Sequence, residues 1–182
     1  GGRGSAPHAW PIRGGGNMRT MRRAERAVTS REELERILDE CKVCRVAMRD
    51  AEGLYIVPMN YGYLWTEEQP RLYFHCAHVG RKLDAIAYDP HVAFEMDGGH
   101  RLIEAASACG YGYAFESITG NAVVSVVKDA QEKCEALGLL MRHQTGRAFS
   151  FTPDMAMAVT VLRLDVLSMT GKRREAPSKA TF

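Results

Sequence analysis

Apolar residues recur along this chain with two spacings, one typical of strands and one typical of helices. Leu162, Leu164 and Val166 alternate with charged residues over residues 159–168, which predicts a strand with one face exposed to water. Shorter apolar or β-branched runs predict further strands at residues 43–48, 54–63, 72–76, 92–96 and 115–127.

Helical spacing predicts helices at residues 30–41, 81–88 and 129–143. The first and the third open with a capping box, in which a side-chain acceptor precedes a glutamate by three residues. The second follows Gly80 and is expected to end before Pro90, because proline cannot continue a helix.

Some segments depart from these patterns. Pro58 lies inside an expected strand and indicates an edge, a bulge or a kink there. Gly120 predicts a bend in the strand that contains it. Residues 97–112 show no clear period and receive no assignment, and the polar tail from Thr170 is expected to be loosely ordered.

Six strands with few, separated helices predict a mainly β fold, an antiparallel barrel with peripheral helices rather than a doubly wound parallel sheet. The sequence has neither a G-x-G-x-x-G after its first strand nor a Walker A motif, so a dinucleotide-binding fold is not expected. We expect a disordered leader or tag at residues 1–20, one domain at residues 21–172 and a loose tail at residues 173–182.

Charge is distributed unevenly along the 182 residues. Residues 1–31 hold seven arginines and one acid, whereas residues 32–171 hold 13 basic and 20 acidic residues. The basic leader could attract nucleic acid, but its Gly/Arg composition with the single aromatic Trp10 is more typical of a flexible tail, so no nucleic-acid partner is expected. No apolar run is long enough to span a bilayer, and no membrane partner is expected.

The five cysteines are odd in number and favour free thiols in a reducing compartment, which predicts a cytoplasmic location. Cys41-x-x-Cys44, with His75 and His78, also suggests a zinc site. The histidines are too distant for a zinc finger, so we favour core packing for the cysteines and expect no metal.

The most informative segment joins the expected strand at 72–76 to the helix at 81–88 through Gly80. A helix N-terminus presents free N–H groups and partial positive charge, and Arg81 and Lys82 stand there as an adjacent cationic pair. This arrangement suits a phosphate group, although two solvated surface cations remain the alternative.

The order of these elements resembles that of the pyridoxamine 5'-phosphate oxidase-like split-barrel flavoproteins, in particular the nitroimidazole-resistance (nitroimidazole reductase-like) branch. The resemblance covers about residues 21–172 and is carried by Cys41-Lys-Val-Cys-Arg45, Tyr55-Ile-Val-Pro-Met-Asn-Tyr-Gly62, Tyr73-Phe-His-Cys-Ala77, Gly80-Arg-Lys-Leu-Asp84, Asp89-Pro90, Val92-Ala-Phe-Glu95 and Glu116-Ser-Ile-Thr-Gly120.

The resemblance implies a six-stranded antiparallel, Greek-key split β-barrel that binds FMN at the interface of a homodimer. It places the FMN phosphate at Arg81 and Lys82 and the flavin ring against residues 57–61. The cofactor-binding residues that it implies are Val57, Pro58, Met59, Asn60, Tyr61, His75, Cys76, Arg81, Lys82 and Ser117. Aromatic side chains at Tyr61, Tyr63 and Phe74 would supply an apolar floor for the flavin.

Three features differ from the vitamin B6 oxidases of this family. Val57 stands where those enzymes place a basic residue, residues 97–112 have no counterpart, and the C-terminal segment lacks their Trp and Arg pattern. Oxidation of pyridoxine phosphate is therefore not expected. The expected function is that of an FMN-dependent oxidoreductase that reduces small aromatic or nitro compounds.

His75 is the candidate catalytic acid, because a histidine titrates near neutrality and can donate a proton to a reduced substrate. A buried, hydrogen-bonded histidine in the barrel wall is the alternative for this position. Two other functions stay open: a haem-binding or haem-degrading protein with His75 or His78 as axial ligand, and a flavin-binding protein without enzymatic activity.

Overall fold

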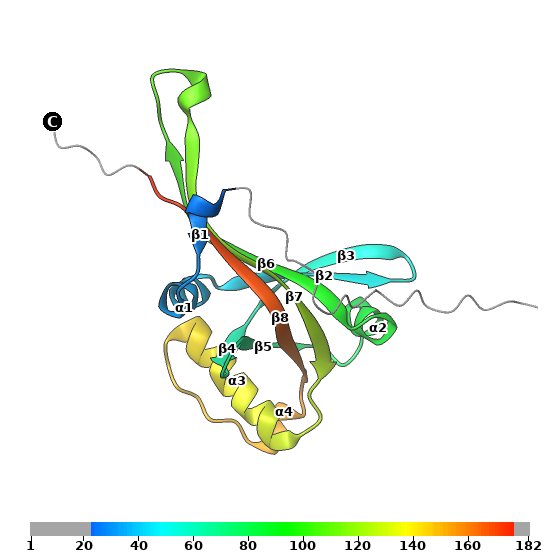
Figure 1. The fold of residues 1–182 in the computed structure, drawn as a ribbon. Helices are drawn as coiled ribbons and strands as arrows, with labels where there is room; N and C mark the ends of the chain where they lie inside the picture. Colours follow the sequence, from blue (N-terminus) through cyan, green and yellow to red (C-terminus); the bar gives the residue numbers. More distant parts are fainter. Residues whose placement is uncertain (1–22, 177–182) are drawn as a thin grey trace, which may run out of the picture.

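The computed structural model describes residues 23–176, which form one antiparallel sheet with helices around it (Figure 1). Its strands are β1 (Ala27–Val28), β2 (Val43–Asp50), β3 (Gly53–Asn60), β4 (Gly62–Trp65), β5 (Pro70–Cys76), β6 (His91–Ile103), β7 (Gly112–Val126) and β8 (Thr160–Arg174). Its α-helices are α1 (Arg31–Glu40), α2 (Arg81–Tyr88), α3 (Ala130–Thr145) and α4 (Pro153–Ala156), and short 3-10 turns lie at Ala24–Arg26 and Ala108–Gly110. The leader expected at residues 1–20 lies outside the described residues.

The strands pair in the order β3-β2-β6-β7-β8-β5-β4, with β1 added beside β8. All of these pairings are antiparallel. β3 and β4 stand at the two ends of this order although they follow each other in the chain, so the sheet curls without closing. The expected mainly β split barrel is therefore confirmed.

The sheet has eight strands rather than the expected six. The expected strand at 54–63 divides at Tyr61 into β3 and β4, and the two-residue β1 is added beside β8. Asn60 and Gly62 flank the division, but the aromatic residues Tyr61 and Tyr63 continue the strand-like composition through it, so one strand was expected.

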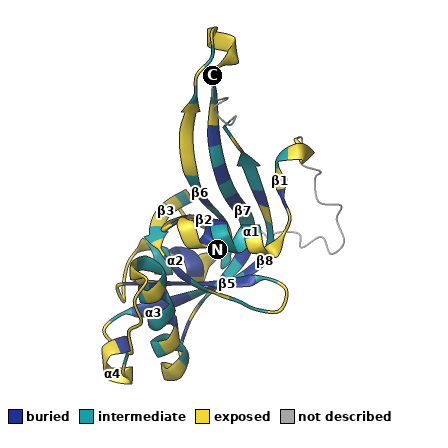
Figure 2. Ribbon diagram, turned by 90° about the vertical axis from the view of Figure 1, so that its left-hand side faces the viewer, coloured by how far each residue is buried: buried dark blue, intermediate teal, exposed yellow. Residues whose placement is uncertain are grey.

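Residues 97–112, which received no assignment, form most of a hairpin arm (Figures 1 and 2). β6 and β7 continue past the end of β8, which pairs with β7 only as far as Phe115 and Arg174. A register shift between Gly98 and Arg101 interrupts the alternation of β6, which explains why the sequence showed no period here.

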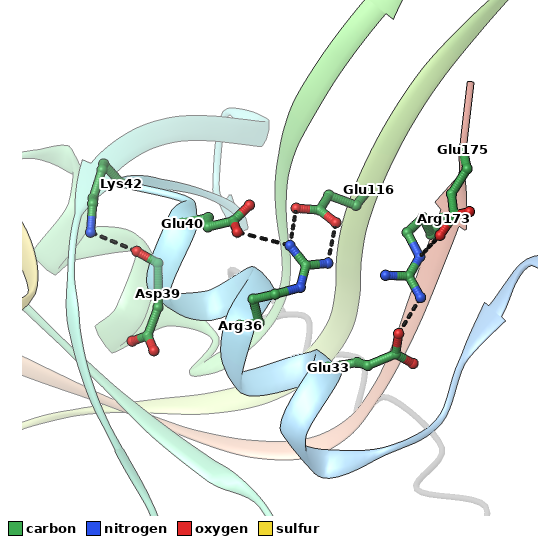
Figure 3. Close-up of polar contacts among 8 residues, drawn as sticks. All are labelled: Glu33, Arg36, Asp39, Glu40, Lys42, Glu116, Arg173 and Glu175. Atoms are coloured by element: carbon green, nitrogen blue, oxygen red, sulfur yellow. Dashed lines mark hydrogen bonds and ion pairs between the residues drawn. The ribbon is translucent and has the colours of Figure 1, made fainter. Parts of the chain in front are cut away.

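The C-terminal strand is longer than expected. β8 pairs with β7 as far as Arg174. The expectation of a loosely ordered tail is therefore wrong for residues 170–174. Polar residues continue this strand because the backbone ladder with β7 and the ion pair between Arg173 and Glu33 stabilise it (Figure 3). Residues 177–182 lie outside the described part of the chain.

The main core fills the curled sheet, and a second cluster lies between α3 and the outer side of β5 and β8. The buried residues of the second cluster are Tyr73, Val127, Ala136, Leu137, Ala156 and Val161.

The expected caps hold α1 and α3: Ser30 accepts from the Glu33 N–H at 3.2 Å, and Asp129 accepts from the Glu132 N–H at 2.8 Å. Among the described helices, none is long and apolar enough to cross a membrane.

Helix α1 is fixed to the sheet by charged side chains (Figure 3). Arg36 donates to both carboxylate oxygens of Glu116 on β7, at 2.5 and 3.0 Å, and also to Glu40 at 2.9 Å. The Glu116 carboxylate is almost fully buried, and the hydrogen bonds from Arg36 hold its pKa below the ordinary value. This pair joins two elements that are 80 residues apart in the sequence.

Candidate functional site

The N-terminus of α2 has no side-chain cap. Its N-cap is Gly80, whose φ of +140° is a conformation that favours glycine. The Gly80 carbonyl accepts from the Leu83 N–H at 2.9 Å, but no side chain accepts the first N–H groups of the helix. By contrast, side chains cap α1, α3 and α4. The predicted strand–glycine–helix unit is thus present, and its free N–H groups suit an anion.

Arg81, the first residue of α2, is held by the β2–β3 turn. Its Nε donates to Oδ2 of Asp50 at 2.6 Å, and its Nη2 donates to Oδ1 at 3.2 Å. The guanidinium carbon also lies 4.6 Å from the ring centre of Tyr55 on β3. Hydrogen bonds from Arg81 are the main reason that the pKa of Asp50 is lowered.

Lys82 and Cys76 lie close enough for the lysine charge to act on the thiol. Burial raises the pKa of Cys76, and the charge of Lys82 acts in the opposite direction. Cys76 is only 9% exposed, so its sulfur belongs mainly to the barrel core. The structure therefore places Arg81 next to the β2–β3 turn, with Lys82 following it in α2 and Cys76 at the end of β5 that leads toward this helix.

The expected flavin strand, β3, stands at one end of the strand order, paired only with β2 in the described part of the chain. Val57 and Met59 are partly buried and pack against the core, whereas Pro58 and Asn60 are exposed on the other side. The Asn60 side chain donates to the Lys42 carbonyl at 3.0 Å. The free edge of β3 offers backbone groups to a ligand, which is what the predicted flavin contact at residues 57–60 needs.

The Tyr61 side chain lies in the core and not in the expected aromatic floor for the flavin. It is fully buried, and its hydroxyl donates to the Leu38 carbonyl at 2.7 Å. Phe74 is also buried, at 1% exposure, and only Tyr63 keeps a partly exposed ring, whose hydroxyl donates to Asp39. The expected aromatic floor is therefore part of the core, because the chain turns inward between β3 and β4.

His75 is exposed on β5 and pairs in register with Val161, so it is not the buried histidine of the alternative interpretation. Neighbouring residues of a strand point to opposite faces, which separates the His75 side chain from that of Cys76. His78 in the following loop lies 3.0 Å from the Thr160 hydroxyl through its Nδ1. A catalytic role for His75 stays a prediction.

Ser117 is not brought to this end of the barrel. Ser117 lies on β7, where it pairs with Asp97 on β6 and Lys172 on β8. Asp97 is six residues along β6 from His91, at the end of the strand that follows α2. At about 3.3 Å per residue this is a separation of about 20 Å within the chain. Contact between Ser117 and the same cofactor stays a prediction that needs a second copy of the chain.

Sequence reasoning missed Asp50 and Tyr55 as parts of this site. Neither residue is among the cofactor-binding residues that the family resemblance implies. Their contact with Arg81 spans 31 residues in the case of Asp50. The one available signal was the turn itself, because an Asp followed by Gly three residues later fixes a carboxylate at the hairpin end.

The cysteine pair of the zinc hypothesis lies in the core. Burial raises the pKa of Cys41 to about 11 and that of Cys44 to about 12, so both thiols are protonated near neutrality. Within residues 23–176, no group of three or more His, Cys, Asp or Glu side chains is arranged to hold a metal ion.

A separate groove of about 470 Å³ lies on the outer face of the sheet. Ala47 and Ala93 line it together with Gly120, where a side chain would collide with the Phe94 ring and the Ser168 carbonyl. The groove contains none of the predicted cofactor residues.

Comparison with known proteins places this chain in a family. The model of the pyridoxamine 5'-phosphate oxidase family matches residues 30–173. The comparison with curated proteins returned no match.

Solved structures with the same fold include a candidate 5-nitroimidazole antibiotic resistance protein from Bacteroides thetaiotaomicron. It is 31% identical, with a TM-score of 0.69, over 81% of this chain and 86% of that chain.

Two more distant structures share the fold. The flavocytochrome Anf3 from Azotobacter vinelandii has a TM-score of 0.70 and 20% identity over 87% of this chain and 73% of that chain. The FAD and heme binding protein from Mycobacterium smegmatis has a TM-score of 0.70 and 20% identity over 85% of this chain and 77% of that chain. With the family model and the 31% identical structure in agreement, this chain belongs to the pyridoxamine 5'-phosphate oxidase-like family, in its nitroimidazole-resistance branch.

Proposed function

We propose that this protein is an FMN-dependent oxidoreductase that reduces small aromatic and nitro compounds. The observation that carries the proposal is the uncapped N-terminus of α2 with Arg81 and Lys82, in a chain of this family. The 31% identical structure named for 5-nitroimidazole resistance supports nitro compounds as the substrate class.

The residues at this end of the barrel suit the phosphate of FMN. Free N–H groups at the start of α2, the Arg81 guanidinium and the Lys82 ammonium would share its negative charge. The free edge of β3, at residues 57–60, would offer backbone groups to the polar edge of the flavin ring.

The flavin, when bound, supplies hydride transfer to the substrate. The chain supplies binding, orientation and a proton. His75 is exposed on β5, and we propose it as the group that donates the proton to the reduced substrate. The reducing equivalents would come from a nicotinamide nucleotide or another donor.

We further propose a homodimer with FMN at its interface. The groove floored by Ala47, Ala93 and Gly120 gives the outer face of the sheet a small-residue depression against which a second copy could pack. A second copy would also explain how Ser117 could contact a cofactor held at Arg81. The five free cysteines support a cytoplasmic location.

The test is a titration of the protein with FMN, in which binding is measured by the change in tryptophan and flavin fluorescence. The variant Arg81→Ala/Lys82→Ala is expected to lose FMN affinity by about 100-fold, since two charge-assisted phosphate contacts are removed. Riboflavin, which lacks the phosphate, serves as the control ligand and is expected to bind both proteins equally. Equal FMN affinity for the variant and the wild type would contradict the phosphate site.

Haem binding is the second candidate function, and the exposure of His75 favours it. His75 is accessible as an axial ligand, whereas the Nδ1 of His78 is occupied by Thr160. Replacement of His75 by Ala should remove a haem signal if this candidate is correct and leave FMN binding in place if it is not.

A further inference from the structure

Arg81 is fixed in place by the chain itself. Asp50 binds two of its nitrogens, at 2.6 and 3.2 Å, and the Tyr55 ring lies against its guanidinium plane. The Asp50 carboxylate is only 10% exposed, whereas the Arg81 side chain is 42% exposed. The less exposed partner, Asp50, therefore belongs to the hairpin turn, and the more exposed partner, Arg81, faces solvent at the start of α2.

The carboxylate of Asp50 is fixed as firmly as its partner. Its Oδ1 accepts from the N–H groups of Glu52 at 2.9 Å and Gly53 at 3.1 Å, in addition to Arg81. These bonds close the turn between β2 and β3 and leave the carboxylate no freedom to follow the arginine. Asp50 thus connects the hairpin turn rigidly to the first residue of α2.

The guanidinium group keeps donors for a second acceptor. Arginine has five N–H donors, and Asp50 uses those of the Nε and Nη2 edge. The N–H groups of Nη1 remain for a phosphate at the helix N-terminus. An arginine that is held on one edge loses less rotamer entropy when its other edge binds a ligand.

We propose that Asp50 is a positioning residue for the cofactor phosphate, which it orients by holding Arg81 at the N-terminus of α2. This inference rests on the proposed function, because it assumes that the phosphate of FMN binds there. Asp50 itself does not touch the phosphate, because its carboxylate and the phosphate are both anions and repel each other.

The opposite arrangement, in which Asp50 competes with the phosphate for Arg81, predicts the opposite sign. A competing carboxylate would have to release Arg81 when the ligand binds, and its removal would strengthen FMN binding. The turn hydrogen bonds to Asp50 and the low exposure of its side chain argue against such release.

The experiment compares the dissociation constants of FMN and riboflavin for the variant Asp50→Asn. Asparagine keeps an oxygen for the turn N–H groups but loses the charge that fixes Arg81. The preference for FMN over riboflavin is expected to fall by about tenfold, the size of one charge-assisted hydrogen bond. Riboflavin affinity should stay unchanged, and a merely structural role of Asp50 would instead weaken both ligands.

The matched control is Glu52→Gln. Glu52 also lies near Arg81, at 3.7 Å, but its side chain is 79% exposed and it forms no fork with the guanidinium. The same loss of a negative charge is therefore expected to leave the preference for FMN unchanged or slightly increased. If Asp50→Asn fails to fold, Asp50→Ser can close the turn through its hydroxyl and is expected to show the same loss of preference.

A double-mutant cycle separates action through Arg81 from any other route. In the Arg81→Ala background, Asp50→Asn should cause no further loss of FMN preference, because the residue to be positioned is absent. An unchanged or increased FMN preference in Asp50→Asn, or an equal further loss in the double variant, would overturn the inference. Failure of the wild type to prefer FMN over riboflavin would instead contradict the proposed function.

Discussion

The hydroxyl of Tyr61 connects the turn between β3 and β4 to the end of α1. It donates to the Leu38 carbonyl at 2.7 Å, and the His143 ring of α3 lies 4.5 Å from the Tyr61 ring. This side chain therefore joins three elements in the core and leaves no ring face for a ligand.

The variant Tyr61→Phe tests this structural role. Loss of the hydroxyl should lower the free energy of unfolding by about 1 kcal/mol, measured by urea denaturation. The loss is modest because the Leu38 carbonyl keeps His143 as a hydrogen-bond partner at 2.8 Å. FMN affinity should not change, and a marked weakening of FMN binding would restore Tyr61 as a cofactor contact.

The ion pair of Glu116 with Arg36 is expected to make the free energy of unfolding fall in acid. The pKa of Glu116 is lowered in the fold by Arg36, so the carboxylate takes up its proton at lower pH when folded than when unfolded. The stabilisation is complete above the unfolded pKa of about 4.5 and is lost as the pH falls through the lower folded pKa. The variant Glu116→Gln should therefore flatten the decline in urea stability between about pH 5 and pH 3.

The control for this pH dependence is Glu104→Gln on the exposed hairpin arm. It should reproduce the wild-type curve, because Glu104 is exposed at the end of β6. A wild-type curve for Glu116→Gln as well would show that the pair with Arg36 does not contribute to acid stability.

At the residue scale, the sequence was sufficient for Arg81 and Lys82 and insufficient for their surroundings. A glycine, two cations and a helical period are local signals, and the structure has them in the predicted arrangement. The contacts of Arg81 with Asp50 and Tyr55 depend on how the β2–β3 hairpin folds back, which no local pattern encodes. The burial of Tyr61 was missed for the same reason.

The backbone of α3 lies very close to the backbone of β4 at Gly62. A Cβ atom added at Gly62 would lie 2.3 Å from the backbone nitrogen of Leu140. The variant Gly62→Ala is therefore expected to lower the free energy of unfolding by about 2–3 kcal/mol through overpacking, measured by urea denaturation.

Gly138→Ala in the same helix is the matched control. Its added Cβ would meet the Phe149 carbonyl oxygen at 3.3 Å, a contact that a small shift relieves. Alanine also favours the helix by about 1 kcal/mol over glycine, so this variant should keep wild-type stability or exceed it. Equal effects of the two substitutions would contradict the close contact between α3 and β4.

At the element scale, capping boxes and periodicity located α1, α2 and α3 correctly. The hairpin arm was not found, because its residues are exposed on a two-stranded ribbon and need no apolar alternation. Leu102, Tyr111 and Tyr113 are each about half exposed there. The end of β8 was missed because pairing with β7 and the ion pair between Arg173 and Glu33 stabilise it, and neither leaves an apolar pattern in the sequence.

For the whole molecule, the count and spacing of strands predicted an antiparallel barrel, whereas the split barrel and the homodimer were implied only by the family resemblance. The proposed homodimer can be tested at the groove on the outer face of the sheet. The variant Ala93→Arg would place a charge on the groove floor and is expected to convert a dimer into monomers in sedimentation experiments. Ala158→Arg, at an exposed position outside the groove, should leave the dimer intact. A dimeric Ala93→Arg variant, or a monomeric wild type, would contradict the proposed interface.

The most direct measurement is the absorption spectrum of the purified protein, followed by acid release and identification of any chromophore. We expect two broad flavin bands and released FMN, or full reconstitution when FMN is added to the colourless protein. A sharp Soret band would move the assignment to haem and to His75 as a ligand. A colourless protein that fails to bind added FMN would contradict the central claim and leave the split-barrel fold without its proposed cofactor.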